Sequence, residues 1–184
     1  MDMSEAELIE QARQGDAIAF RRIYEATSGF VFNVALRITG RTEEAEEVTQ
    51  DVFIAAHRAL GSFRGQSALK TWLYRITVNR SLNKVKSAAG RRREVPYEEY
   101  MDTPQDTMPD APLIAGDISR KVQAMLDTLA PEFRACVVLR EIEGLSYEAI
   151  AQALNININT VRTRISRARR QLAETARQGG SYDM

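Results

Sequence analysis

The sequence predicts an all-α protein of two small helical domains, joined by an acidic linker that contains prolines. Apolar residues recur at helical spacing, and almost no stretch shows the alternation of apolar and polar residues that strands require. The net charge is zero, but residues 61–93 hold nine Lys and Arg and no acid, whereas residues 94–117 hold seven acids and no base. Four of the five prolines also lie in residues 94–117. We therefore expect domains at residues 1–93 and 118–184 around a flexible linker at 94–117.

Three helices are expected before residue 41. The first covers residues 4–14, with a serine that can cap its start and Gly15 as its stop. Asp16 can cap a second helix, whose apolar positions are Ile18, Phe20, Ile23 and Tyr24. A separate third helix is expected over residues 30–38, ended by Gly40.

The fourth expected helix runs from Thr42 to about Leu60 and begins with glutamates, which the positive end of a helix favours. Its core side is predicted to carry Ala45, Val48, Val52, Ala55, Ala56 and Ala59. Its other side carries Glu43, Glu47, Gln50, Asp51, Ile54, His57 and Arg58. Ile54 is the only apolar member of that second side. A singly exposed hydrophobic residue and an apolar anchor of a protein interface both fit this pattern, and the sequence does not choose between them.

The basic segment 61–93 combines positive charge with the aromatic residues Phe63, Trp72 and Tyr74. A loop is expected over residues 61–67, with Ser67 as the cap of the helix that follows. Basic side chains follow a phosphate backbone, and aromatic rings stack on unpaired bases. Core packing is an equally good interpretation of the two aromatic residues within the helix, so the segment indicates nucleic-acid binding without fixing its faces.

Two supporting helices are expected after the linker, at residues 118–129 and from Pro131 to Gly144. They precede the most informative stretch, residues 144–172, which is typical of a helix-turn-helix. Its first helix follows Ser146, its turn contains Asn155, and its second helix is expected to start near Asn159 and reach residue 173. The second helix has a narrow apolar seam made of Val161, Ile165, Ala168 and Leu172. The rest of its surface is arginine and hydroxyl, which suits a helix that enters a DNA groove.

Enzymatic and metal-binding functions are disfavoured by composition. The chain has one histidine, His57, and one cysteine, Cys136, which lie in different predicted domains and cannot form a usual zinc site. No glycine-rich phosphate loop and no paired acids in apolar surroundings occur, so we expect no catalytic residue and no cofactor. Cys136 lies in an apolar run and is expected to be buried and reduced, which favours a cytoplasmic location. We expect neither a signal peptide nor membrane insertion, because the N-terminus is polar and acidic.

Two stretches resemble one family. EEAEEVTQDVFIAAHRALGSFRGQSALKTWLYRITVNRSLN is similar to the second conserved region of the extracytoplasmic-function (ECF) sigma factors, the compact branch of the sigma-70 family. LDTLAPEFRACVVLREIEGLSYEAIAQALNININTVRTRISRARRQL is similar to their fourth region. The turn NININ departs from the glycine- or proline-containing turns that are frequent in the family.

The resemblance implies a transcription initiation factor that binds core RNA polymerase and promoter DNA. It implies −35 readout by Asn159, Thr160, Arg162, Thr163, Arg164, Ser166, Arg167 and Arg170. It implies melting and readout of the −10 element by Ser62, Phe63, Arg64, Gly65, Lys70, Trp72, Asn79, Arg80 and Asn83. It places core polymerase against Glu47, Gln50, Asp51, Ile54 and Arg58. It further implies an anti-sigma factor as a partner, and a monomer when the protein is free.

The alternative function is that of a helix-turn-helix regulator that binds DNA without polymerase. The basic segment with aromatic residues argues against it, because a repressor of duplex DNA has no use for a single-strand platform. A gel shift on duplex promoter DNA without polymerase would separate the two functions.

Overall fold

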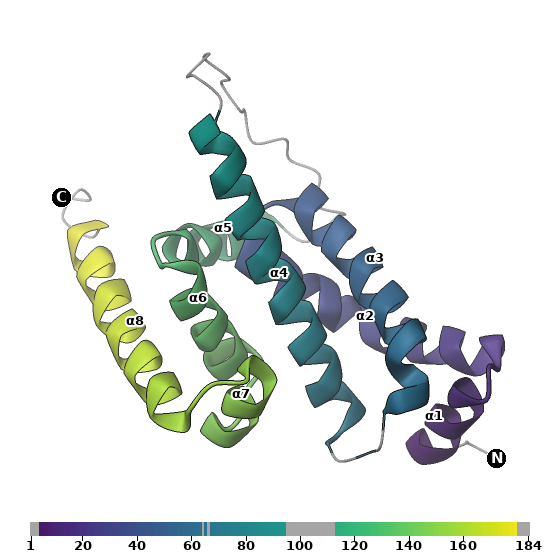
Figure 1. The fold of residues 1–184 in the computed structure, drawn as a ribbon. Helices are drawn as coiled ribbons and strands as arrows, with labels where there is room; N and C mark the ends of the chain where they lie inside the picture. Colours follow the sequence, from purple (N-terminus) through teal and green to yellow (C-terminus); the bar gives the residue numbers. More distant parts are fainter. Residues whose placement is uncertain (1–3, 64, 66, 95–112, 180–184) are drawn as a thin grey trace.

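The computed structural model describes residues 4–63, 65, 67–94 and 113–179, and all regular elements among them are helical. Two groups of helices lie side by side, with α1 to α4 forming one and α5 to α8 the other (Figure 1). In chain order the elements are α1 (Glu5–Arg13), α2 (Ala17–Thr39), α3 (Thr42–Ala59), a 3₁₀ turn (Leu60–Ser62), α4 (Leu69–Glu94), α5 (Leu113–Asp127), α6 (Pro131–Val137), a π-helical stretch (Val138–Ile142), α7 (Tyr147–Leu154) and α8 (Ile158–Gly179).

The first two helix starts lie where the sequence places them. Ser4 forms a capping box with Glu7: the Ser4 Oγ accepts from the Glu7 backbone N–H at 3.3 Å, and the Glu7 carboxylate accepts from the Ser4 N–H at 2.9 Å. The hydrogen bonds that the Glu7 carboxylate accepts from the Ser4 backbone N–H and from the Ser4 hydroxyl lower the pKa of Glu7. The Asp16 carboxylate accepts from two backbone N–H groups of the first turn of α2, at 2.8 and 3.1 Å.

The expectation of separate second and third helices is wrong, because α2 continues through Gly29 as one helix of 23 residues. A glycine inside a helix costs only about 1 kcal/mol relative to alanine, and the apolar face that buries Ile23 and Val31 runs past it. Two of the apolar positions named for the second helix are exposed, Ile18 at 69% and Tyr24 at 45%. The predicted stop at Gly40 is confirmed, since this residue takes the left-handed conformation with φ 78°.

The α3 helix has the two faces that the sequence indicates, with one addition. Ala45, Val48, Val52 and Ala56 are buried, but Ala55 and Ala59 are only half-buried. Phe53, which the pattern did not assign to the core, is 6% exposed and packs against the ring of Tyr24 with centroids 4.7 Å apart. The following helix, α4, begins at Leu69, so the expected cap at Ser67 is too early.

The second group begins earlier than expected, since α5 starts at Leu113 and takes in residues assigned to the linker. Pro131 occupies the first turn of α6, as predicted, and Gly144 ends the segment with φ 71°. Cys136 is buried and unpaired with another cysteine. Residues 95–112, the rest of the predicted linker, lie outside the described part of the chain.

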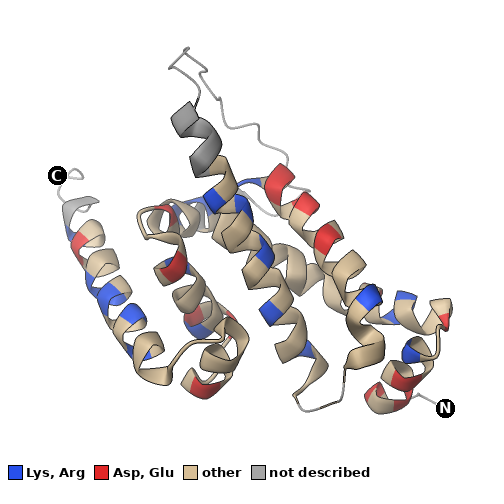
Figure 2. Cartoon of the chain, in the orientation of Figure 1, with Lys and Arg blue, Asp and Glu red and all other residues tan. Residues whose placement is uncertain are grey.

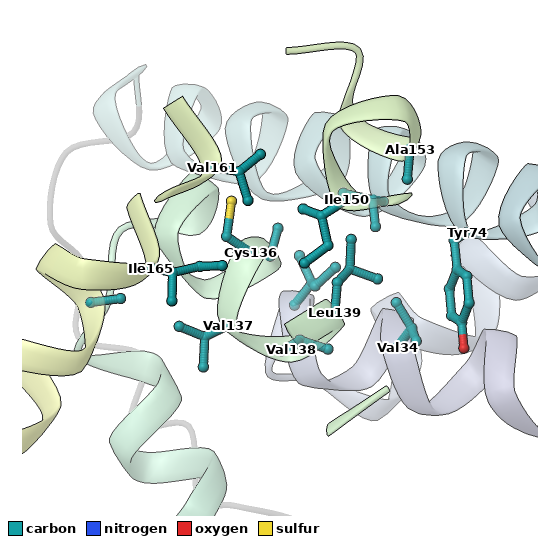
Figure 3. Packing of buried hydrophobic residues seen from close by; sticks show 14 of the residues in the cluster. Val34, Tyr74, Cys136, Val137, Val138, Leu139, Ile150, Ala153, Val161 and Ile165 are labelled. Carbon is teal, nitrogen blue, oxygen red and sulfur yellow. The ribbon is translucent and has the colours of Figure 1, made fainter. Parts of the chain in front are cut away.

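One apolar core joins the two groups of helices. Val34, Ile38, Tyr74 and Val78 from α2 and α4 belong to the same buried cluster as Leu139, Ile150, Ala153 and the seam of α8. Figure 3 shows Val34 and Tyr74 beside Val138, Leu139 and Ala153. A second cluster fills the interior of α1 to α4 alone. The helix-turn-helix is therefore fixed against α4.

Candidate nucleic-acid interface

The helix-turn-helix is built by three local devices. The Ser146 Oγ accepts from the Ala149 N–H at 3.1 Å and caps α7. Asn155 takes the left-handed conformation with φ 52° and ψ 49°, as the sequence predicts for the turn. The start of α8 is capped by Asn157, whose side chain accepts from the Asn159 N–H at 2.8 Å. The expected cap at Asn159 is thus wrong by two residues, because three asparagines alternate with isoleucines here and each could cap.

The predicted apolar seam of α8 faces the core, and this orients its polar surface outward. Val161, Ile165 and Ala168 are buried and Leu172 is half-buried. Of the eight residues that the sequence assigned to DNA, Asn159, Arg162, Thr163, Ser166, Arg167 and Arg170 are exposed, and Thr160 and Arg164 are half-buried. Figure 2 shows several basic residues along α8. The structure therefore brings the eight residues together on one outward surface.

The first turns of this surface are hollowed. A groove of about 350 Å³ is lined by Phe133, Asn159, Thr160, Thr163, Arg164 and Arg167. At the same end of α8 the Arg162 guanidinium donates to the Asn159 side chain at 3.1 Å, and the Thr163 hydroxyl donates to the Asn159 carbonyl at 2.8 Å. These two hydrogen bonds order the N-terminal end of α8. This end of a recognition helix is the part that contacts base edges.

Residues that fix α8 and the segment before α7 were missed by the sequence reasoning. Arg169 donates two hydrogen bonds to the Glu141 carboxylate, at 2.6 and 3.1 Å, and this pairing raises the pKa of Arg169. Gln171 donates to the carbonyl of Thr128 at 2.7 Å. Arg140 donates to the Leu145 carbonyl at 2.7 Å. These partners are between 5 and 43 residues apart, and no sequence pattern signals such pairs.

The basic α4 and the loop before it present a second set of candidate residues. Ser62, Gly65, Lys70, Asn79, Arg80 and Asn83 are exposed, and Arg64 lies outside the described residues. The aromatic residues of this segment are more buried than these polar residues. Tyr74 is 2% exposed and Phe63 is 7% exposed, so both rings belong to the core in this conformation. Trp72 is half-buried and lies over Phe63 with centroids 5.1 Å apart. The core interpretation holds for Tyr74, and Trp72 is the aromatic residue of this segment with a partly open face.

The outer face of α3 carries an apolar hollow within charged surroundings. Glu47, Gln50, Asp51, Ile54 and Arg58 are all exposed, as predicted. Ile54 is 51% exposed and lies in a hollow of about 320 Å³ that Phe20, Phe53, His57 and Arg58 also line. The ring of Phe20 meets that of His57 edge-on, with centroids 4.9 Å apart. The hollow thus joins α2 and α3, and the contribution of α2 was not foreseen.

The surfaces of α3 and α4 meet at one further point. Glu47 forms an ion pair with Lys84, a residue that the sequence reasoning did not single out. Asp51, Arg80 and Asn83 line the same small recess, of about 210 Å³. Acidic residues of the α3 face and polar residues of α4 are therefore neighbours.

Within the described part of the chain, no group of three or more His, Cys, Asp or Glu residues could hold a metal ion. None of the helices described here has the length and apolar character needed to cross a membrane.

Comparison with known proteins matches both halves of the chain. The sequence model of sigma-70 region 2 matches residues 23–91, and that of sigma-70 region 4 matches residues 119–172. The RNA polymerase sigma-H factor of Pseudomonas aeruginosa is 36% identical over 172 residues, which are 89% of each protein. The ECF RNA polymerase sigma-E factor of Haemophilus influenzae is 34% identical over 186 residues, covering 92% of this chain and 94% of the relative.

Solved structures share the fold. CnrH, in complex with the cytosolic domain of CnrY, has a TM-score of 0.68 at 26% identity, covering 93% of this chain and 96% of that one. The sigma factor RpoE of Bartonella quintana, in complex with the anti-sigma factor NepR, has a TM-score of 0.67 at 22% identity, covering 90% and 98%.

The all-helical fold, the outward basic helix-turn-helix and the two matched regions define a sigma factor of the sigma-70 family. The chain belongs to the ECF branch of that family, which consists of initiation factors. Its function is to direct RNA polymerase to promoters at the start of transcription.

Proposed function

We propose that three surfaces of the chain divide the work of promoter recognition. The outward surface of α8 reads the −35 element, α4 with the loop before it melts and reads the −10 element, and the outer face of α3 binds core polymerase. The observation that carries the proposal is the joint exposure of the residues involved: six of the eight −35 residues and all five polymerase residues are exposed. Apolar seams fix both helices from behind, so these faces are available to partners.

For the −35 element, the best base readers are Arg162 and Arg167, because both are exposed near the N-terminal half of α8. An arginine that contacts a guanine edge through two hydrogen bonds contributes about 1–3 kcal/mol of discrimination. Arg169 lies on the same helix but is paired with Glu141, so it serves to position α8.

For the −10 element, Asn79, Arg80 and Asn83 supply polar and basic groups on exposed positions of α4. Trp72 supplies a partly open ring at the side of the loop. Such a combination suits an unpaired strand, which offers bases for stacking and phosphates for ion pairs. Phe63 then has an indirect role, because its ring packs against Trp72 and supports it.

For the polymerase, Ile54 is the apolar anchor and Glu47, Gln50, Asp51 and Arg58 form the charged and polar rim. Interfaces commonly place a few apolar anchors inside a polar rim of this kind. We further propose that the free chain is a cytoplasmic monomer and that an anti-sigma factor holds it inactive. The support is the family resemblance together with CnrH, whose structure was solved with a protein partner.

The experiment compares Arg162→Ala with Arg169→Ala in holoenzyme binding to a promoter with its cognate or a scrambled −35 element. Arg162→Ala should weaken binding to the cognate element by about tenfold, which corresponds to 1.4 kcal/mol, and leave the scrambled one nearly unchanged. Arg169→Ala should weaken binding to both promoters to a similar degree, because loss of the pair with Glu141 loosens α8. If Arg162→Ala lowers the affinity for both promoters equally, Arg162 contacts the phosphate backbone and does not read a base.

A further inference from the structure

The first helix, α1, packs on the interior of its half of the chain without entering it. Leu8, Ile9 and Ala12 on its inner side are half-buried and pack against the apolar cluster of α2 to α4. No residue of α1 is fully buried. The stretch that matches sigma-70 region 2 begins only at residue 23, so that match assigns α1 no role. What α1 does must therefore be inferred from its contacts.

Besides α2, α1 lies against the 3₁₀ turn Leu60–Ser62, which follows α3. Figure 1 shows α1 beside this end of α3. Leu60 is 2% exposed, and it belongs to the apolar cluster against which Leu8 and Ile9 pack. The inner side of α1 therefore covers the part of the interior to which the turn contributes.

The turn has few hydrogen bonds of its own to fix it. The Phe63 N–H donates to the Leu60 carbonyl at 3.0 Å, and the Ser62 hydroxyl donates to the Ala59 carbonyl at 2.8 Å. Segments of 3₁₀ helix are short and have poorer hydrogen-bond geometry than α-helices. The position of the turn therefore depends on the packing around Leu60, and α1 supplies a part of that packing.

The turn in turn determines where the next residue, Phe63, lies. Phe63 is 7% exposed and belongs to the same cluster as Leu60. Its ring packs on that of Trp72, with centroids 5.1 Å apart and an angle of 45° between the planes. Trp72 is the partly open ring assigned above to the unpaired −10 strand. A continuous series of contacts therefore leads from α1 through Leu60 and Phe63 to Trp72.

The helix at the start of this series is held in place mainly by packing. It has nine residues, fewer than the about 12–15 that an isolated helix needs in water. The capping box of Ser4 and Glu7 supports its first turn, but its other attachment is the apolar side that contains Leu8 and Ile9. Smaller side chains there should release the turn while the fully buried interior of α2 to α4 stays packed.

We propose that Leu8 and Ile9 of α1 are positioning residues for promoter melting: through Leu60 and Phe63 they hold the ring of Trp72 where an unpaired base stacks on it. Neither residue contacts DNA in this arrangement. The proposal rests on the function proposed above for α4 and the loop before it.

The test uses the fact that Trp72 is the single tryptophan of the chain, so its fluorescence reports on its own surroundings. The double variant Leu8→Ala with Ile9→Ala is compared with the conservative pair Leu8→Met with Ile9→Val. Acrylamide quenching of the free chain is measured well below the Tm of each variant. Affinity for core polymerase is measured by titration, and the rate of open-complex formation by permanganate footprints.

Two control variants separate this role from a general loss of stability. Gln11→Ala changes an exposed residue of α1 and should behave as wild type. Ala45→Gly removes a fully buried methyl group at the far end of α3, 15 residues or about 22 Å along the helix from Leu60. It should lower Tm but leave the Trp72 fluorescence and the melting rate unchanged.

The double alanine variant should shift the Trp72 emission to longer wavelength and increase its quenching. Open complexes should form about fivefold more slowly, because a stacking contact of about 1–3 kcal/mol is partly lost. Affinity for polymerase should stay within about twofold of wild type, and the conservative pair should restore fluorescence and rate. Leu8→Ala alone should show the same changes to a smaller degree, and it serves as the test if the double variant does not fold.

A lower Tm with wild-type quenching and wild-type melting would overturn the proposal, because α1 would then serve the fold alone. Altered quenching with an unchanged melting rate would overturn it as well, since the position of Trp72 would not matter for melting. If the wild-type chain forms no open complex with polymerase, the function proposed above fails. The quenching data would still decide whether α1 positions Trp72.

Discussion

Replacing Ile54 by alanine tests the face of α3 that we assign to polymerase. Ile54 is 51% exposed, so a partner that fills the hollow around it would newly bury about half of the side chain. Burying a whole isoleucine side chain is worth about 1.5–3 kcal/mol, and half of that is about 0.8–1.5 kcal/mol. The cavity that alanine would leave in a packed interface adds to the loss. We therefore expect Ile54→Ala to weaken binding to core polymerase about tenfold, which corresponds to 1.4 kcal/mol.

The same substitution should change the stability of the free protein little. The buried half of Ile54 lies against the rim of the hollow and not in the interior cluster, so the loss should stay below about 1 kcal/mol, or a fall of about 2–4 °C in Tm. Val52→Ala is the matched control, because Val52 is fully buried on the same helix. That change should lower the free energy of unfolding by about 1–3 kcal/mol, and so lower Tm more than Ile54→Ala does. It should leave the affinity of the folded fraction unchanged.

The assay is a titration of labelled protein with core enzyme, paired with a thermal melt of the protein alone. Asp51→Ala should act mainly on the association rate, and its effect should shrink at high salt, because exposed charges are screened. A result in which Ile54→Ala lowers Tm and leaves affinity intact would refute the reasoning. Ile54 would then serve the fold of this chain, and another face would bind polymerase.

Three further changes test the other parts of the account. Asn79→Ala should spare polymerase binding but slow open-complex formation, and permanganate footprints of wild-type intensity would contradict the role of α4 in melting. Asn155→Ala should cost about 1 kcal/mol of stability because alanine is strained at φ 52°, whereas Asn155→Gly should be neutral or stabilising in the same melts. Tyr74→Phe removes the hydroxyl that bonds Glu143 and keeps the ring, so it should lower the stability of the folded chain by about 1 kcal/mol; an unchanged Tm would show that this bond contributes nothing to the fold.

Much of the local structure was predictable because short-range chemistry decides it. Ser4, Asp16 and Ser146 cap their helices as expected, and Asn155 takes the left-handed turn. The burial of the α8 seam follows from its helical spacing alone, and with it the outward direction of the arginines. Errors arose where several residues could do the same task, as at Asn157, or where packing outweighs a weak local preference, as at Gly29 within α2.

Long-range arrangement could not be read from the pattern. The burial of Phe53 depends on Tyr24, which lies 29 positions earlier on another helix. The pairing of Tyr74 with Glu143 spans 69 residues. Charge segregation indicated two domains and a linker, but it carried no information on how apolar faces of α2 and α4 would meet those of α6 and α7. The apolar contact between the two groups of helices follows only from the packed structure.

The most direct test of the account is run-off transcription with purified core polymerase on a template that carries both promoter elements at their natural spacing. The account predicts a discrete transcript only when the chain and core enzyme are both present, and loss of that transcript when either element is scrambled. A chain that binds the duplex promoter tightly without polymerase, and gives no transcript with it, would contradict the account and favour a polymerase-independent regulator.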